Sequence, residues 1–185
     1  MALTKNNLLP TDFRAPSFSL PDVVSGKQLH LNDLKGNKAT VLMFICNHCP
    51  YVQHLEQGII ALANDYLSQQ VGFVAISSND VVRYPADGPE EMREKALRLS
   101  YPFPYLYDET QEVAKAYHAV CTPEFYLFDA QNYCIYHGQF DDARPGKHLP
   151  VTGKTLRSAL DAFLNDQPIP SPQLPSMGCS IKWKN

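Results

Sequence analysis

Two cysteines separated by two residues carry the clearest chemistry in this sequence. Cys46, Asn47, His48 and Cys49 follow one another, and Pro50 comes directly after them. Thiols at this spacing can close a disulfide within one turn of chain. If a helix begins here, its unbonded N–H groups and its dipole favour an anion, and the pKa of a thiol can fall from about 8.5 to roughly 3.5–7.5. The pair therefore predicts thiol–disulfide exchange, in which one thiolate attacks and the other cysteine resolves the mixed disulfide.

A charged imidazole at His48 would stabilise that thiolate further. The competing interpretations are zinc ligation and a pair of inert core cysteines. A structural zinc ion needs four ligands, but the sequence has no second cysteine pair and its 6 histidines are scattered. Redox chemistry is therefore favoured, with no metal ion and no cofactor other than a Cys46–Cys49 disulfide.

A buried strand and a helix are expected to position the pair. Residues 39–45 form an apolar run, which is typical of a central strand covered on both faces. After Pro50, apolar residues recur at helical spacing as far as Tyr66. The pair thus lies between the end of a buried strand and the start of a helix.

The other elements alternate along the chain. A hairpin is expected over residues 18–31, around a Ser25-Gly26 turn. Further strands are predicted at 71–76, 105–107, 125–128 and 134–136, and further helices at 89–99, 110–116 and 152–164. This order predicts an α/β fold with a mixed central sheet and flanking helices.

The chain of 185 residues fits one domain with two extensions. We expect an N-terminal arm over 1–14, a domain over 15–165 and a proline-rich, extended C-terminal tail over 166–185. The tail holds Trp183, the single tryptophan, so it is expected to dock on the domain or on a partner.

Charge and composition indicate which classes of partner the protein lacks and in which cellular compartment it is expected. The formal net charge is −3 and basic residues form no cluster, so we expect no nucleic-acid partner. No apolar run reaches the ~18 residues that span a bilayer, so no membrane partner is expected. The first residues show no signal peptide, and the 5 cysteines are an odd number for a closed disulfide framework. A cytoplasmic protein is therefore expected.

Several motifs together resemble one known family. The cysteine pair is followed much later by Thr122 and Pro123 before a strand, and further motif residues lie at 138–142 and 178–183. With the strand and helix around the pair, these segments resemble the thioredoxin superfamily, and more narrowly its peroxiredoxin-like AhpC/TSA branch with a thioredoxin-type cysteine pair. The resemblance implies a thioredoxin fold, a cis peptide bond at Pro123 facing the pair, and an extended substrate docked beside Thr122 and Pro123.

The resemblance leaves two redox functions open. A thiol–disulfide oxidoreductase would act on protein or small-molecule disulfides, and a thiol peroxidase would use Cys49 as its peroxidatic cysteine on hydroperoxides. When the peroxiredoxin Pro-x-x-x-Thr-x-x-Cys pattern is aligned on Cys49, Leu42 and Cys46 stand at the Pro and Thr positions, and no pocket arginine is found. A third alternative is a copper- or zinc-binding metallochaperone-like protein. Both redox functions need a thiol reductant, which the sequence does not identify, and either a monomer or a homodimer is compatible with it.

The attacking cysteine also has two candidates. The thioredoxin pattern favours Cys46, with Cys49 as the resolving cysteine, and we prefer this assignment. However, if Cys49 is the N-cap, Pro50 becomes the first helical residue, which is its favoured place, and Cys49 then lies closer to the helix dipole.

Three residues outside the pair are possible accessories: Cys121, Glu124 and Cys179. Cys121 is either a third thiol near the pair or a small buried side chain. Cys179 is either a distant resolving cysteine on a mobile tail or a packing residue. Glu124 is either a proton acceptor near the thiols or a solvated charge at the end of a strand. His137 is not among these accessories and is expected at the surface or at a helix end.

The sequence predicts that the Cys46–Cys49 pair is more oxidising than thioredoxin. A histidine before the second cysteine resembles protein disulfide isomerase and the periplasmic disulfide oxidants, whose reduced forms are stabilised. Equilibration with glutathione buffers measures the reduction potential. A value at or below that of thioredoxin would contradict this prediction.

Overall fold

The computed structural model describes residues 3–10 and 12–185. Its strands are β1 (Leu3–Lys5), β2 (Ser19–Pro21), β3 (Gln28–His30), β4 (Ala39–Phe44), β5 (Val71–Ser77), β6 (Tyr105–Tyr107), β7 (Cys121–Thr122), β8 (Glu124–Asp129), β9 (Cys134–Gly138) and β10 (Met177–Ser180). Its helices are α1 (Leu31–Leu34), α2 (Pro50–Leu67), α3 (Pro89–Arg98), α4 (Glu112–Ala116) and α5 (Lys154–Leu164), with a short 3-10 helix η1 (Pro85–Asp87) before α3.

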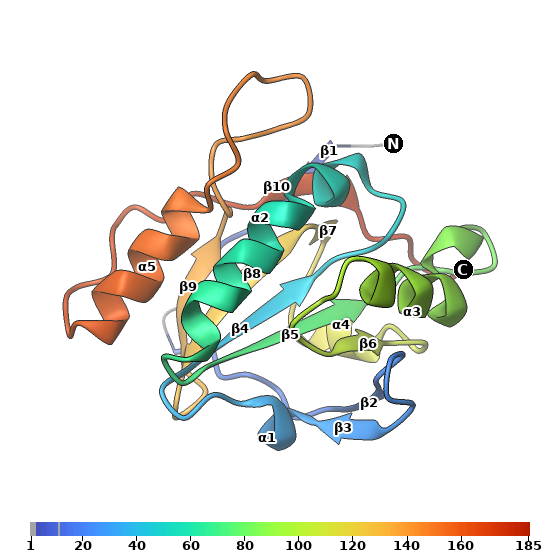
Figure 1. The fold of residues 1–185 in the computed structure, drawn as a ribbon, viewed down its shortest axis with the longest axis horizontal. Coiled ribbons are helices and arrows are strands. Elements are labelled where there is room, and N and C mark those ends of the chain that lie inside the picture. Colours follow the sequence, from blue (N-terminus) through green and yellow to red (C-terminus); the bar gives the residue numbers. More distant parts are fainter. Residues whose placement is uncertain (1–2, 11) are drawn as a thin grey trace.

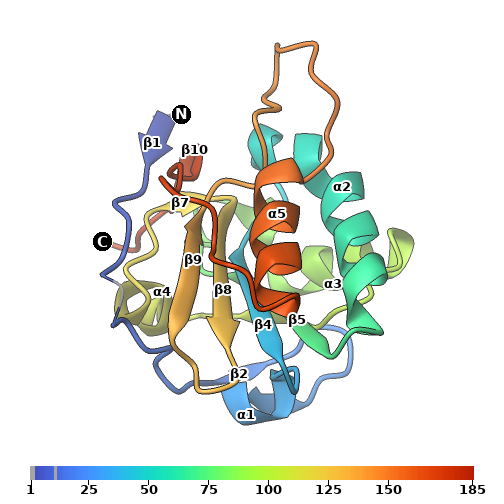
Figure 2. The ribbon, with the colours of Figure 1, turned by 90° about the vertical axis from the view of Figure 1, so that its left-hand side faces the viewer.

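A five-stranded mixed sheet forms the centre of the molecule, in the order β6-β5-β4-β8-β9. The strands β4, β5 and β6 run parallel, whereas β8 is antiparallel to β4 and to β9. Helices α2, α3 and α5 cover one face, and α1, α4 and the β2–β3 hairpin cover the other (Figures 1 and 2). The predicted α/β fold with a mixed sheet and flanking helices is confirmed.

Burial on both faces explains the apolar run at β4. All 6 residues of this strand are buried. Val41 and Met43 pack in the layer under α2, while Leu42 and Phe44 pack in the opposite layer with the hairpin and α4. Each large side chain buried in this way stabilises the fold by about 1.5–3 kcal/mol. The loop that leaves the end of β4 is therefore anchored on a rigid strand.

A second sheet joins the two ends of the chain, with the order β1-β10-β7. Leu3 lies opposite Cys179 in the β1–β10 pair, and Cys179 lies opposite Thr122 in the β10–β7 pair. Periodicity along the chain did not indicate this sheet, because its strands are only 2 to 4 residues long. The tail thus docks on the domain, and Cys179 lies in a strand rather than on a mobile tail.

Gly178 permits the close approach of β10 to β7. A Cβ at this position would lie 2.0 Å from the carbonyl oxygen of Thr122 and 3.1 Å from Cδ of Pro123. Only a residue without a side chain fits there. Further along, Ile181 is buried, and Trp183 is partly exposed with the Lys115 ammonium 5.8 Å from its ring centroid.

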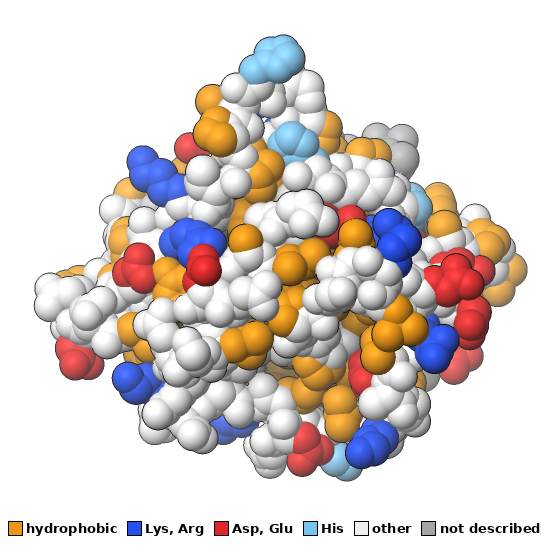
Figure 3. Space-filling model, viewed as in Figure 1, with side chains coloured by type: hydrophobic (Ala, Val, Ile, Leu, Met, Phe, Trp, Pro, Cys, Tyr) orange, Lys and Arg blue, Asp and Glu red, His pale blue; other side chains and the backbone are white. Residues whose placement is uncertain are grey.

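The surface of the described residues shows no strong asymmetry of charge in the view of Figure 3. Lys and Arg side chains on this face lie among Asp and Glu side chains rather than in one basic patch. Within residues 3–10 and 12–185, none of the helices has both the length and the apolar character to span a membrane.

Replacing Gly178 with alanine is expected to displace β10 from β7. Overpacking of this kind lowers the free energy of unfolding by about 1–3 kcal/mol, because the added Cβ has no space. Urea unfolding of the reduced protein measures the loss, with Ser180→Ala on the same strand as the control. An unchanged unfolding midpoint for Gly178→Ala would mean that the two strands are not packed as the structure has them.

Candidate active site

The cysteine pair lies where β4 ends and α2 begins. Cys46 follows the strand by two residues, Cys49 is the N-cap of α2, and Pro50 is its first helical residue. The 18-residue helix starts here because proline lacks the N–H that a first helical residue would leave unbonded. Both cysteines are at most 1% exposed. The structure therefore has the arrangement in which Cys49, rather than Cys46, is nearest the positive end of the helix dipole.

Thr122 contacts both sulfur atoms of the pair. Its hydroxyl oxygen lies 3.3 Å from Cys46 Sγ, and its carbonyl oxygen lies 3.2 Å from Cys49 Sγ. The Thr122–Pro123 peptide bond is cis, as the family resemblance implied. The start of α2 thus lies against β7, through the Cys49–Thr122 contact, and α2 also contacts β10, the strand that pairs with β7.

Cys46 and Cys49 have different surroundings, and these shift the pKa values of the two thiols in opposite directions. A hydrogen bond from Cys46, together with bonds from Cys179 and the backbone N–H of Val52, outweighs burial and lowers the pKa of Cys49 to about 5. Burial, the hydrogen bond to Cys49 and the nearby Asp87 carboxylate raise the pKa of Cys46 well above its usual value. A thiolate at Cys49 is therefore favoured over one at Cys46, which is the reverse of the assignment preferred from the sequence.

His48 is held by Asp87, a residue that the sequence did not single out. Nδ1 of His48 lies 2.5 Å from Oδ2 of Asp87, and its ring stacks on Tyr84 at 4.9 Å between centroids. Cys46 Sγ is 3.9 Å from the same ring nitrogen. The imidazole therefore lies closer to the Asp87 carboxylate than to the Cys46 sulfur. Any positive charge on the ring would be balanced by the negative charge of Asp87 and would not act on the thiols alone.

Asp87 also fixes the backbone of the loop between the cysteines. Its Oδ1 accepts N–H bonds from Asn47 at 2.8 Å and His48 at 3.0 Å, and its Oδ2 accepts from the Asn79 amide at 2.8 Å. Burial favours the neutral acid, but the hydrogen bonds from His48 and Asn79 prevail and the pKa of Asp87 lies below its usual value. The fully buried Asp87 carboxylate thus accepts the hydrogen bonds that water would otherwise accept from the backbone of this loop.

Asn47 is held from the opposite side by α2, α3 and β6. Its carbonyl oxygen accepts from Gln53 Nε2 at 2.9 Å and Lys95 Nζ at 3.3 Å, and its side-chain oxygen accepts from the Tyr105 hydroxyl at 3.3 Å. Lys95 also pairs with Glu56 at 2.6 Å. Lys95 and Tyr105 are distant in sequence from Asn47, and no spacing or motif pointed to them.

The predicted accessory cysteines differ in their relation to the pair. The thiol of Cys179 donates a hydrogen bond to Cys49, and burial raises the pKa of Cys179 to about 12. Cys121 Sγ instead lies 3.5 Å from Oε2 of Glu124, and burial raises its pKa far above the usual value. Cys134 Sγ lies 3.4 Å from the Tyr136 carbonyl oxygen.

Glu124 and His137 are both buried, so Glu124 is not a solvated charge, and the expectation that His137 lies at the surface or at a helix end was wrong. Leu9 N donates to His137 Nδ1 at 3.2 Å, which leaves Nε2 to donate to Glu124 Oε1 at 2.8 Å. The carboxylate also accepts from the Val120 and Cys121 backbone and from the Tyr126 hydroxyl. Burial would raise the pKa of Glu124, but the hydrogen bonds from His137, Val120 and Cys121 outweigh it, so this pKa lies below its usual value. This cluster anchors the N-terminal arm beside β7.

The site contains one group of three side chains that could bind a metal ion. Cys46, His48 and Asp87 each bring one potential ligand atom within 4.8 Å of the others. The Asp87 oxygens, however, already accept bonds from two backbone N–H groups, Asn79 and His48. A metal ion would have to replace these bonds, which hold the loop in place.

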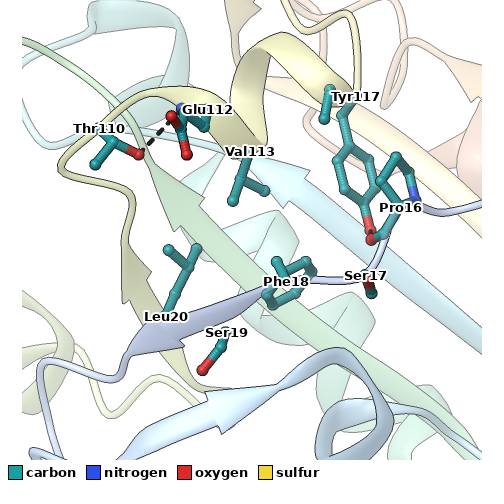
Figure 4. Close-up of a pocket in the computed structure, with 10 residues that line it drawn as sticks. Pro16, Ser17, Phe18, Ser19, Leu20, Thr110, Glu112, Val113 and Tyr117 are labelled. Atoms are coloured by element: carbon teal, nitrogen blue, oxygen red, sulfur yellow. Dashed lines mark hydrogen bonds between the residues drawn. The ribbon is translucent and has the colours of Figure 1, made fainter.

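A separate cavity of about 280 Å³ lies between β2 and α4. Figure 4 shows its lining, in which Phe18, Leu20, Val113 and Tyr117 point inward and Thr110 accepts a bond from the Glu112 backbone. It belongs to the layer opposite α2, and no cysteine or histidine lines it. The cavity is therefore not part of the thiol site.

The fold and the site define a thioredoxin-fold protein with a cysteine pair at a helix N-terminus. A model of the AhpC/TSA family matches residues 12–137. The chain therefore belongs to the AhpC/TSA family. No curated protein matches it.

Solved structures agree with this assignment. An uncharacterized conserved protein from Geobacillus kaustophilus has 55% identity and a TM-score of 0.97, covering 100% of this chain and 97% of its own. A hypothetical protein from Sinorhizobium meliloti has 42% identity and a TM-score of 0.95, covering 98% of each chain. A putative thioredoxin from Neisseria meningitidis has 27% identity and a TM-score of 0.63, covering 82% of this chain and 90% of its own. The family and the similarity to a putative thioredoxin support an oxidoreductase.

The reduced protein is expected to show one thiolate titration with a pKa of about 5. Ultraviolet thiolate absorbance should rise as the pH passes upward through this value, because the folded pKa of Cys49 is depressed. Cys49→Ser should abolish the step, and Cys46→Ala should move it to higher pH by removing the strongest hydrogen bond to the thiolate. Cys134→Ser serves as the control, and a step that survives Cys49→Ser would refute the assignment.

Proposed function

We propose that this protein is a thiol–disulfide oxidoreductase that cycles Cys46 and Cys49 between a dithiol and a disulfide. The observation that carries the proposal is the hydrogen-bonded pair of thiols at the start of α2, of which one is favoured as a thiolate. A thiolate is the attacking species in disulfide exchange. A neighbouring thiol that donates to it is placed to resolve the product.

In the proposed cycle, Cys49 attacks first. Its thiolate bonds to one sulfur of a substrate disulfide, and the other substrate sulfur leaves as a thiolate and takes up a proton. The negative charge on Cys49 is then consumed, so one cause of the raised pKa of Cys46 disappears. Cys46 loses its proton and attacks Cys49 Sγ, the bond between Cys49 and the substrate sulfur breaks, and that sulfur leaves as a thiolate that takes up the proton.

The surroundings of Cys46 serve the resolving step. Thr122 Oγ1 lies 3.3 Å from its sulfur, and His48 Nδ1 lies 3.9 Å from it. Because His48 Nδ1 is bonded to Asp87, the Thr122 hydroxyl is the hydrogen-bonding partner that remains for Cys46 while its proton leaves. An external thiol then reduces the Cys46–Cys49 disulfide by the same steps in reverse.

A thiol peroxidase is the second candidate. The placement of Cys49 as N-cap, with Pro50 as the first helical residue, favours it, and so does membership of the AhpC/TSA family. The Cys49 thiolate would attack one peroxide oxygen, giving a sulfenic acid and releasing water or an alcohol. Cys46 would then form the disulfide with loss of water.

The proposed partners follow from this chemistry. They are protein or small-molecule disulfides, or hydroperoxides, together with a thiol reductant. We place the protein in the cytoplasm, with no nucleic-acid or membrane partner and no cofactor beyond the disulfide. The metallochaperone-like alternative would gain support if purified protein carried stoichiometric copper or zinc.

Oxidised glutathione tests the proposed exchange. Reduced protein should form a Cys46–Cys49 disulfide, mapped by mass spectrometry, and should return to the dithiol with reduced glutathione. Cys49→Ser should lose both reactions because the favoured thiolate is gone, while Cys134→Ser should keep them. Failure of the wild-type protein to form this disulfide would refute the function.

Hydrogen peroxide separates the two candidates. A stopped-flow competition assay compares the reduced protein with free cysteine. A rate orders of magnitude above that of free cysteine would establish the peroxidase. A rate near that of free cysteine, with ready exchange with glutathione, would leave the disulfide oxidoreductase.

A further inference from the structure

The strand β10 covers the edge of β7 that lies beside the thiols. An exposed strand edge offers unpaired N–H and C=O groups to any extended segment. Here the chain fills that edge with its own C-terminal strand, with Cys179 opposite Thr122 and Ser180 opposite Cys121. Gly178 allows this strand to approach within van der Waals contact of Thr122.

This pairing brings a third thiol to the cysteine pair. Thr122 contacts the sulfurs of Cys46 and Cys49, and its partner in β10 is Cys179. The Cys179 thiol is hydrogen-bonded to Cys49, and Cys46 is hydrogen-bonded to Cys49 as well. Cys49 Sγ therefore has two thiol neighbours, one from the loop after β4 and one from the C-terminal strand.

We propose that Cys179 is a third redox-active thiol that exchanges with the Cys46–Cys49 disulfide to give a Cys49–Cys179 disulfide. The proposal rests on the proposed function, because it begins from the oxidised pair. The Cys179 thiolate attacks Cys49 Sγ, the Cys49–Cys179 bond forms and the Cys46–Cys49 bond breaks. Cys46 leaves with the electron pair and takes up the proton that Cys179 lost, so no external oxidant is needed.

The charges around Cys179 change in its favour when the pair is oxidised. The hydrogen bond to Cys49 and the negative charge there are two of the causes that hold its thiol protonated, and both disappear in the disulfide. The ammonium group of Lys182, which favours a thiolate at Cys179, remains. Lys182 is held in place by bonds from Nζ to the carbonyl oxygen of Ser180 at 2.7 Å and to its hydroxyl at 3.2 Å.

The other two cysteines are not equivalent candidates. Cys121 Sγ is directed to the Glu124 carboxylate and the Pro123 carbonyl oxygen. Cys134 lies in the layer opposite α2, with the hairpin and α4. The exchange is therefore specific to Cys179, and it would tie the C-terminal strand covalently to the start of α2.

Peptide mapping of a Cys46→Ser variant tests this inference. Trypsin releases Cys49 on peptide 39–83, Cys179 on peptide 158–182, and Cys121 with Cys134 on peptide 116–147. After treatment of reduced protein with oxidised glutathione, the expected product links 39–83 to 158–182 and has lost glutathione. Cys46→Ser/Cys179→Ser should lose this product and retain glutathione on Cys49, whereas Cys46→Ser/Cys134→Ser should keep it.

The outcomes separate the inference from the function. A Cys46–Cys49 disulfide in the wild type, combined with only glutathionylated Cys49 in Cys46→Ser, would refute the inference and leave the function intact. A link to peptide 116–147 in place of 158–182 would refute it as well. If Cys46→Ser does not fold by circular dichroism, the same linked peptide is sought in the wild type over graded glutathione ratios, and its absence throughout would count against the proposal.

Discussion

The rest of the site depends on stabilising one negative charge on a sulfur atom that solvent does not reach. Cys49 is fully buried, yet its pKa lies at about 5. A buried anion is costly unless donors surround it. The donors here come from four separate parts of the chain: Cys46 in the loop after β4, Cys179 in the C-terminal strand, Val52 in the first turn of α2, and Thr122 in β7. The packing of α2, β4 and β10 therefore places the hydrogen-bond donors that stabilise the Cys49 thiolate in the place of water.

Asp87 is a second buried negative charge, and its position decides which sulfur is acidic. It holds the loop through the backbone of Asn47 and His48, but its charge raises the pKa of Cys46. The same carboxylate thus orders the loop and disfavours a thiolate on the cysteine nearer to it. The helix dipole favours a thiolate on the other. Both effects favour the thiolate on Cys49 over the thiolate on Cys46.

The sequence was most informative where a local pattern determines structure. The burial of β4, the start of α2 and the first helical position of Pro50 follow from composition and spacing within a few residues. Contacts between distant segments have no such signature. Asp87 is 40 residues from the loop backbone it binds, and the buried pair of Glu124 and His137 depends on two adjacent strands and the N-terminal arm. The place of Cys179 beside Cys49 follows from a strand of only 4 residues, too short to recognise by periodicity.

The pairing of β1 with β10 also determines how the molecule would respond to tension. The two strands are antiparallel, and both chain ends leave the ladder at the rung where Leu3 faces Cys179. A pulling force applied through the two ends would therefore open this ladder one rung at a time, as a zipper opens, instead of shearing all its bonds together. From the C-terminal end, the bonds of Lys182 to Asn79 and of Lys184 to Gln111 would part before the rung that carries Cys179. Tension on the two chain ends would thus act on the strand that carries Cys179.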